Sequence, residues 1–367
     1  MKHPVVITVL FHPEDKIGTA VADRFIRHFD KLGMARGGIN VRIPVRFRSE
    51  SYYADGMFLP ISGEADLLDV AVLLYSPEMA MDDTPWKTLC LDAQAEFSRT
   101  GKNFMPFVVQ TDASASPPNE LSRLLHVNFD RWSGHSDEEH ATRLLINLVN
   151  SIRRKIGQWP TGYREVIFIS HAKRDGRTAA ERIVRHISDP TGGLKLNTFY
   201  DALELEYGED WIAGLKHHAT TGSLIALVSD TYDERPWCNQ EILWAKEHRR
   251  PILMVDIGRS RVERSFPYGG NAPLLRDPLE TTAAIEFILL ELLSEALRCD
   301  LFLKVAGALP NVFPLPRPPE LLDLAYLIGQ AAGRTLVYPD PQISTVESDL
   351  LKLMTPHGQR ICALGEL

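Results

Sequence analysis

A tryptophan and a glutamate stand one helical turn apart in the segment RPWCNQEILWAKE, residues 235–247. On a helix, side chains at positions i and i+4 share a face, so Trp237 and Glu241 are expected to be neighbours. An indole offers a flat apolar wall and partly desolvates the carboxylate, which could then stabilise a positive charge developing in a ligand. The alternatives are a solvated glutamate, favoured near a helix start by the helix dipole, and a tryptophan that anchors the core or an interface.

A second group of reactive side chains lies in FISHAKRDG, residues 168–176, at the end of a short apolar run. The loop carries hydroxyl, imidazole, cationic and acidic groups: Ser170, His171, Lys173, Arg174 and Asp175. Its cations could contact phosphate groups, arginine through a planar fork of donors and lysine as a point charge. The alternative is a solvated loop in which Asp175 caps the next helix.

The segment FYDALELEYGEDW, residues 199–211, leads from a predicted strand into a loop. Phe199 at the strand end could stack on a planar ligand, although a phenylalanine there also suits the core. Asp201 follows it at the start of the loop. Glu209 and Asp210 stand near a predicted helix start, where acids are favourable without any chemistry.

The sequence does not support several other kinds of site. His217 and His218 are adjacent on a predicted helix and face different directions, which disfavours a metal site. Cys238 is expected to pack, because no histidine is suggested beside it to activate a thiolate. The sequence contains no GxxxxGK[ST] loop and no GxGxxG after a strand, which argues against an ATPase or a hydride-transfer enzyme.

The composition narrows the cellular compartment and the classes of partner that we expect for this protein. The four cysteines stand far apart, at positions 90, 238, 299 and 362, and predict neither a disulfide framework nor a zinc site, so a reducing cytoplasm is the simplest compartment. A formal net charge of −8 argues against nucleic acid or an anionic membrane as a partner. The N-terminus does not resemble a signal peptide. Three glutamates interrupt the apolar helix expected at 283–298, which indicates a buried amphipathic helix rather than a membrane span.

Short apolar runs alternate with helical patterns, as is typical of parallel sheets covered by helices. In the second half, strands are expected at 166–170, 194–201, 223–229 and 251–257, and helices at 176–188, 208–220, 239–249 and 283–298. The first half predicts strands at 5–11, 41–47, 69–76 and 103–110, with helices at 17–32 and 140–156. Pro44 places its strand at a sheet edge or a bulge.

The pattern divides the chain into a first domain at 1–156, a linker at 157–163, a second domain at 164–300 and an extension at 301–367. The extension begins Pro-rich and then predicts one helix and one short strand at 334–341. Two strands at most cannot form an independent sheet domain. The extension is therefore expected to pack on the second domain or on a partner.

The two α/β domains share a local pattern. DVAVLLYSPEM is followed by Pro85-Trp86, and SLIALVSDTY is followed by Pro236-Trp237. Four residues after the tryptophan, the first domain has Cys90 where the second has Glu241. The domains are either ancient copies, of which only the second kept a carboxylate, or unrelated parallel-sheet units that match by chance.

Three segments together resemble a TIR domain (Toll/interleukin-1 receptor type). They are FISHAKRDG, FYDALELEYGEDW and SDTYDERPWCNQEI, each at the end of a predicted strand, and the resemblance covers roughly residues 163–300. It implies an α/β fold of two flavodoxin-like parallel-sheet domains, the second a TIR domain, plus a small C-terminal α/β extension. The first domain resembles, more faintly, a TIR-like unit without the catalytic glutamate.

The resemblance also implies an activity. Many bacterial and plant TIR domains cleave NAD+ at the nicotinamide–ribose bond with a glutamate in W-C-x-x-E, which matches Glu241. NAD+ would then be a substrate, with no separate cofactor or metal. The residues expected to contact it are Trp237, Phe199, Ser170, His171, Lys173, Arg174 and Asp201. The product would be nicotinamide with ADP-ribose or a cyclic ADP-ribose, as in prokaryotic antiphage effectors.

The family further implies self-association through the loop at 201–209, which can complete the active site, and possible work beside a separate sensor protein. A non-enzymatic TIR module that binds other TIR domains in signalling is the alternative. A third hypothesis is a sensor whose first domain binds a nucleotide signal, although the sequence contains no ligand-specific motif for it.

Overall fold

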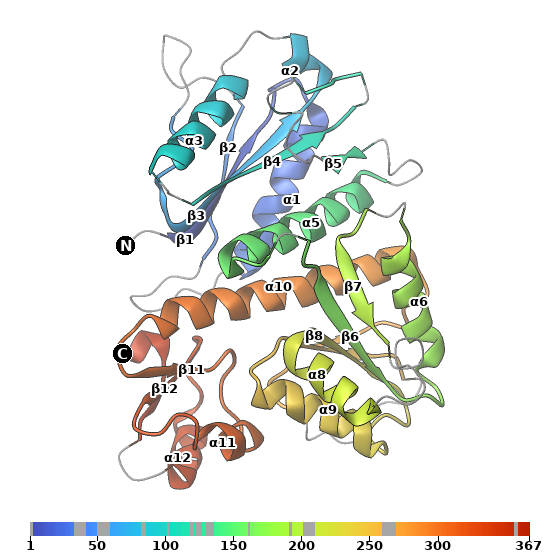
Figure 1. The fold of residues 1–367 in the computed structure, drawn as a ribbon, viewed down its shortest axis with the longest axis vertical. Helices are drawn as coiled ribbons and strands as arrows, with labels where there is room; N and C mark the ends of the chain where they lie inside the picture. The colour runs from blue at the N-terminus through green and yellow to red at the C-terminus, as the bar shows by residue number, and fades with distance from the viewer. Residues whose placement is uncertain are drawn as a thin grey trace. The chain divides into compact units, whose positions relative to one another are not determined.

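The chain divides into two compact units, with the boundary between Gln158 and Trp159. This boundary falls within the predicted linker. The computed structural model (Figure 1) describes residues 3–32, 42–49, 59–81, 86–100, 103–112, 114–117, 121, 127–129, 136–160, 162–190, 193–200, 210–258, 269–355 and 359–367.

The first unit is built on a five-stranded parallel sheet. Its elements are β1 (His3–Leu10), α1 (Lys16–Leu32), β2 (Val45–Arg48), β3 (Ala65–Tyr75), α2 (Pro77–Met81), α3 (Trp86–Thr100), β4 (Phe104–Gln110), β5 (Val127–Asn128) and α5 (Asp137–Gly157). The strand order is β2-β1-β3-β4-β5. β2 lies at the edge, and Pro44, which has no N–H to donate, directly precedes it.

Helices cover both faces of the first sheet (Figure 1). α3 packs on one face, where Cys90 meets a cluster that includes Leu73 of β3. α1 and α5 contact each other, and α5 contacts β3. Because β3 is covered on both faces, it is buried without interruption from Leu68 to Tyr75, which explains its continuous apolar sequence.

The second unit repeats this plan. Its first elements are β6 (Glu165–His171), α6 (Arg177–Ser188), β7 (Leu196–Phe199), α8 (Trp211–Thr221), β8 (Ser223–Val228), α9 (Pro236–Glu247), β9 (Ile252–Asp256), β10 (Leu274–Arg276) and α10 (Thr282–Gly307). The parallel sheet has the order β10-β9-β8-β6-β7. Taken in chain order, the strands of both units follow the flavodoxin-like order, so the predicted fold class is confirmed. The sequence did not predict β10, whose three residues are not buried.

A buried cluster of side chains packs between the second sheet, α8 and α9. It contains Ala226 of β8, Leu215 of α8 and Ile242 of α9. The ring of His218 in α8 stacks on the ring of Phe199, with centroids 3.8 Å apart and an interplanar angle of 17°. α10 contacts α6, β8 and β9. The helices therefore shield both faces of the sheet and leave its carboxyl edge for a site.

α10 is longer than the sequence predicted, because it continues to Gly307 and crosses the predicted domain end at residue 300. Two of its glutamates are buried but paired: Glu286 lies 3.3 Å from His186 of α6, and Glu295 lies 2.6 Å from Arg298. Paired acids can be buried at a tolerable cost. No helix in the described part of the chain is long and apolar enough to cross a membrane.

The extension contains more structure than predicted. Its elements are β11 (Val312–Pro314), α11 (Leu321–Leu327), β12 (Thr335–Tyr338), α12 (Thr345–Met354), β13 (Ile361–Ala363) and η2 (Leu364–Glu366). The expectation of at most two strands is wrong, because three strands form a parallel sheet in the order β11-β12-β13. β11 and β13 have three residues each, too few for an alternating pattern to reveal them.

Buried ionic contacts join the extension to α9 and α10. Lys246 of α9 pairs with Glu320, with side chains 1% and 17% exposed. Arg317 lies 3.5 Å from Glu295 of α10. Arg249 follows α9 and donates to the carbonyl of Pro314 at 3.2 Å. The extension therefore packs directly on the helix that carries Glu241.

Acid should destabilise the second unit through His218. Burial, and then the neighbouring His217, lower the pKa of His218 from 6.5 to about 4. Between these pH values the unfolded chain binds a proton at this ring that the folded chain does not, so stability falls as pH falls through this window. We expect the melting temperature to drop less between pH 6.5 and 4 in His218→Phe, which keeps the stacked ring. Parallel pH profiles for the two proteins would contradict this assignment.

Removing one partner of the buried pair of Lys246 and Glu320 should lower the free energy of unfolding much more than removing one partner of an exposed pair. Glu320→Gln leaves the Lys246 ammonium buried without its nearest carboxylate, and we expect a loss of about 2–4 kcal/mol in urea unfolding. The control is Asp349→Asn, which breaks the exposed 3.0 Å pair with Lys352. It should cost less than about 1 kcal/mol. Equal losses would mean that the contact with α9 contributes little.

Candidate active site

The strand order places the candidate residues around one point of the second sheet. β6 and β8 are neighbours in the sheet, and the chain leaves them in opposite directions, from β6 to β7 on one side and from β8 to β9 on the other. In such sheets, ligands bind beyond the carboxyl ends of the strands at this reversal. Ser170 and His171 end β6, and Ser229 follows β8 directly. The predicted loops therefore meet at the carboxyl end of the sheet, beside this reversal.

A chain of hydrogen bonds holds Glu241 at this point. The Oγ of Ser170 donates to Oε2 of Glu241 at 2.5 Å and lies 2.6 Å from the hydroxyl of Tyr232. A serine hydroxyl has one proton, so when Ser170 donates to the carboxylate, Tyr232 must donate to Ser170. All three side chains are buried, with Glu241 7% exposed. The carboxylate is thus fixed from one side by two hydroxyl groups in series.

Tyr232 and Cys238 keep their protons in this setting. Burial, then the charges of Cys238 and Glu241, raise the pKa of Tyr232 well above 10.0. Burial, then the charge of Glu241, raise the pKa of Cys238 to about 12. The thiol therefore packs beneath the site as a neutral group, as the sequence predicts, and is not a nucleophile.

Asp175 ties the loop after β6 to the loop after β8. Its carboxylate accepts from the hydroxyls of Ser229 at 2.6 Å and Thr231 at 2.8 Å, and from the Thr231 amide at 3.0 Å. Although burial raises its pKa, these hydrogen bonds bring it below the ordinary value. Asp175 does not cap α6, whose N-cap is Gly176 without a side-chain bond. The bridge keeps Ser170 and Tyr232 within reach of each other.

Two tryptophans form a half-exposed pair at the starts of α8 and α9. Pro236 occupies the first position of α9, where its missing N–H leaves no helix bond unmade, and Trp237 follows. Trp237 is 42% exposed and Trp211 43% exposed. Their rings meet edge to face with centroids 4.5 Å apart. Asp210, which caps α8 through the amides of Ile212 and Ala213, sets the start of the helix that presents Trp211.

The remaining residues that the sequence predicted to contact NAD+ differ in how exposed their side chains are. Phe199 is 1% exposed and belongs to the core cluster, so its predicted stacking on a ligand does not fit this placement. His171 is buried with its ring stacked on Tyr200 at 5.1 Å, which favours packing. Lys173 and Arg174 are exposed on the loop before α6. Asp201 lies outside the described residues, as does the whole loop at 201–209.

Sequence reasoning missed three contributors: Tyr232, the bridging role of Asp175, and Trp211. Tyr232 stands within SDTYDERPWCNQEI, directly after a buried strand, which is the signal that could have singled it out. Among the described residues no cluster of histidine, cysteine, aspartate or glutamate could hold a metal ion. Glu241 lines neither of two cavities that described residues form, one in the first unit and one beside the starts of β6 and β7.

Comparison with known proteins adds one informative match. No curated protein matches the chain. Among solved structures, a dipicolinate synthase chain from Bacillus halodurans is 11% identical, with 81% of this chain and 97% of that chain covered, but its TM-score of 0.18 carries no argument. The family model of the TIR domain matches residues 167–274, from β6 to the start of β10. The chain therefore contains a TIR domain at these residues, with the candidate site inside that domain.

Proposed function

We propose that the TIR domain cleaves NAD+ at the nicotinamide–ribose bond, with Glu241 as the catalytic carboxylate. The observation that carries this proposal is the placement of Glu241: buried, bonded to Ser170 and located at the strand ends where parallel sheets bind ligands. The products would be nicotinamide and ADP-ribose or a cyclic ADP-ribose.

The chemistry requires a fixed negative charge. As nicotinamide departs, positive charge develops on the ribose, and the transition state resembles an oxocarbenium ion. A carboxylate that is already oriented and poorly hydrated stabilises this charge without reorganising. The bonds from Ser170 and Tyr232 supply this orientation, so both are positioning residues.

The tryptophan pair and the loop cations suit the rest of the substrate. Trp237 shares a helix face with Glu241, and its half-exposed ring could stack on nicotinamide, with Trp211 extending the aromatic surface. Lys173 and Arg174 could contact the pyrophosphate. Asp201 keeps its sequence-based assignment as a contact of NAD+.

We further propose that the enzyme is an immune effector of antiphage type that works in the cytoplasm and is activated by self-assembly through the 201–209 loop, which would complete the site across subunits. The first unit would then be a regulatory or assembly module. Its fold matches that of the TIR domain, but the position that corresponds to Glu241 holds Cys90, which is buried in the α3 cluster.

A non-enzymatic TIR interaction module is the second candidate. Three apolar side chains at the starts of α8 and α9 are exposed, Trp211, Ile212 and Trp237. Such a patch suits contact with another TIR domain as well as contact with a substrate. Absence of NAD+ turnover by the assembled wild-type protein would favour this candidate.

Replacing Glu241 tests the catalytic assignment. Glu241→Gln removes the charge but keeps an oxygen that can accept from Ser170, and we expect nicotinamide release from NAD+ to fall by roughly 10²–10³-fold. The release is measured by chromatography at protein concentrations that permit assembly. Glu247→Gln, at the end of the same helix, should leave the rate unchanged. Equal turnover by Glu241→Gln and the wild-type protein would reject the role of this carboxylate.

Ser170→Ala tests the positioning of the carboxylate. Without the Ser170 hydroxyl, Glu241 is less well oriented in the transition state, so kcat should fall by about tenfold while KM changes little. Ser223→Ala is a matched control, because Ser223 donates to Glu165 in a buried bond at the start of β8, opposite the site. Both variants should lose similar stability. A similar fall in kcat for both would show that the effect is general destabilisation.

A further inference from the structure

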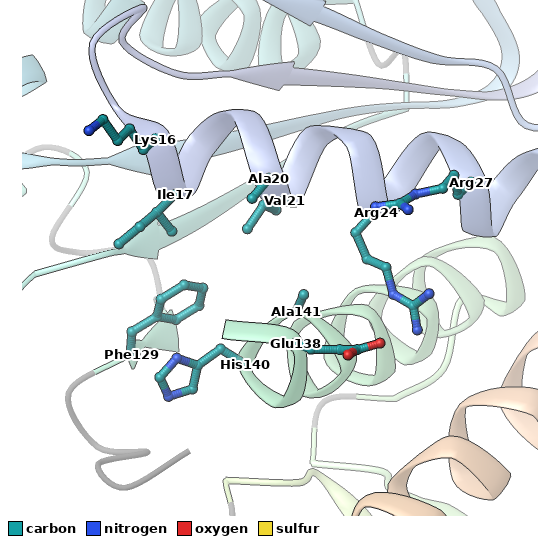
Figure 2. A pocket seen from close by; sticks show the side chains of 10 residues that line it. All are labelled: Lys16, Ile17, Ala20, Val21, Arg24, Arg27, Phe129, Glu138, His140 and Ala141. Carbon is teal, nitrogen blue, oxygen red and sulfur yellow. The ribbon is translucent and has the colours of Figure 1, made fainter. Parts of the chain in front are cut away.

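A cavity of about 370 Å³ lies in the first unit between α1 and the start of α5 (Figure 2). One wall is a face of α1, whose lining residues recur at helical spacing: Lys16, Ile17, Ala20, Val21, Arg24 and Arg27. The other wall is Phe129, just after β5, and the first turns of α5. The volume falls in the range of small-molecule sites, about 300–1,000 Å³.

Cations gather at this cavity although the whole chain has a net charge of −8. Lys16, Arg24 and Arg27 line it, against one carboxylate, that of Glu138. In Figure 2 the Arg24 side chain extends from α1 toward α5. Its Nε is buried and has no hydrogen-bond partner in the part of the chain that the structure describes. A buried donor of this kind is costly unless something accepts from it.

The opposite end of the cavity is aromatic and apolar. The rings of Phe129 and His140 stack with centroids 5.1 Å apart and an interplanar angle of 23°. Figure 2 shows this ring pair beside Ile17, while Arg24 and Arg27 lie farther along α1. The cavity therefore joins a flat apolar end to an end with two guanidinium groups.

We propose that this cavity binds a nucleotide. Guanidinium groups match phosphate through paired N–H donors, so Arg24 and Arg27 would hold the phosphate. The base would stack at the end formed by Phe129 and His140, since every base offers a π-face to an aromatic side chain. Glu138 would accept from a ribose hydroxyl or from an exocyclic amine.

Neither half of the ligand suffices alone. A bare anion would leave the aromatic end empty, and a neutral nucleoside would leave Arg24 without an acceptor.

The site lies in the first unit and does not depend on the reaction proposed for the TIR domain. It would give that unit a ligand of its own, which no sequence motif reveals.

Titration calorimetry of the full chain tests this site with three probes: AMP, adenosine and inorganic phosphate. AMP should bind, and adenosine and phosphate should each bind at least about tenfold more weakly, because each lacks one of the two groups that the cavity accommodates. No heat from AMP, or equal affinity for AMP and phosphate, would overturn the proposal.

Substitutions in the cavity test whether AMP binds there. Arg24→Gln should weaken AMP binding by at least about tenfold through loss of a charge-assisted bond. Ile17→Trp, at a position already 37% exposed, should block the aromatic end without disturbing the core. Arg99→Gln removes an exposed arginine of α3 as a control and should not change AMP affinity. AMP binding that survives both Arg24→Gln and Ile17→Trp would place the ligand elsewhere and refute the site.

Discussion

The second unit depends on one buried carboxylate and the hydroxyl groups that keep it there. Removing a carboxylate from water is costly unless hydrogen bonds compensate, and Ser170, backed by Tyr232, supplies that compensation to Glu241. These three side chains come from β6, from the loop after β8 and from α9. Only a sheet in which β6 and β8 are neighbours can bring them together. The strand order is therefore a condition for the chemistry proposed for this site.

The surrounding contacts hold the helix that carries this carboxylate. At its start, Pro236 sets the first turn and Cys238 packs in the core cluster. At its end, Lys246 is buried against Glu320 of the extension. The pKa of Lys246 is lowered overall, because burial lowers it more than the charge of Asp323 raises it. α9 is thus fixed at both ends, which suits the role proposed for Glu241, that of a catalytic group that must not reorganise.

The sequence predicted the long buried strands and the helix that carries Glu241, because continuous apolar runs and helical spacing are local signals. It could not predict Asp175 as a bridge, since its partner Thr231 lies 56 residues farther along the chain. Phe199 shows another limit: at a strand end, residue type alone does not reveal whether a ring faces the core or a ligand. β11 and β13 were missed because three residues cannot show a period.

The proposed reaction requires Glu241 to lie against the ribose of NAD+ while nicotinamide departs. The most direct measurement is an experimental structure of the Glu241→Gln variant, which should be too slow to consume its substrate, with NAD+ bound. We expect the nicotinamide ribose to lie beside the side chain at position 241, beyond the ends of β6 and β8. NAD+ bound elsewhere, with position 241 still enclosed by Ser170 and Tyr232 and out of reach of the sugar, would contradict it.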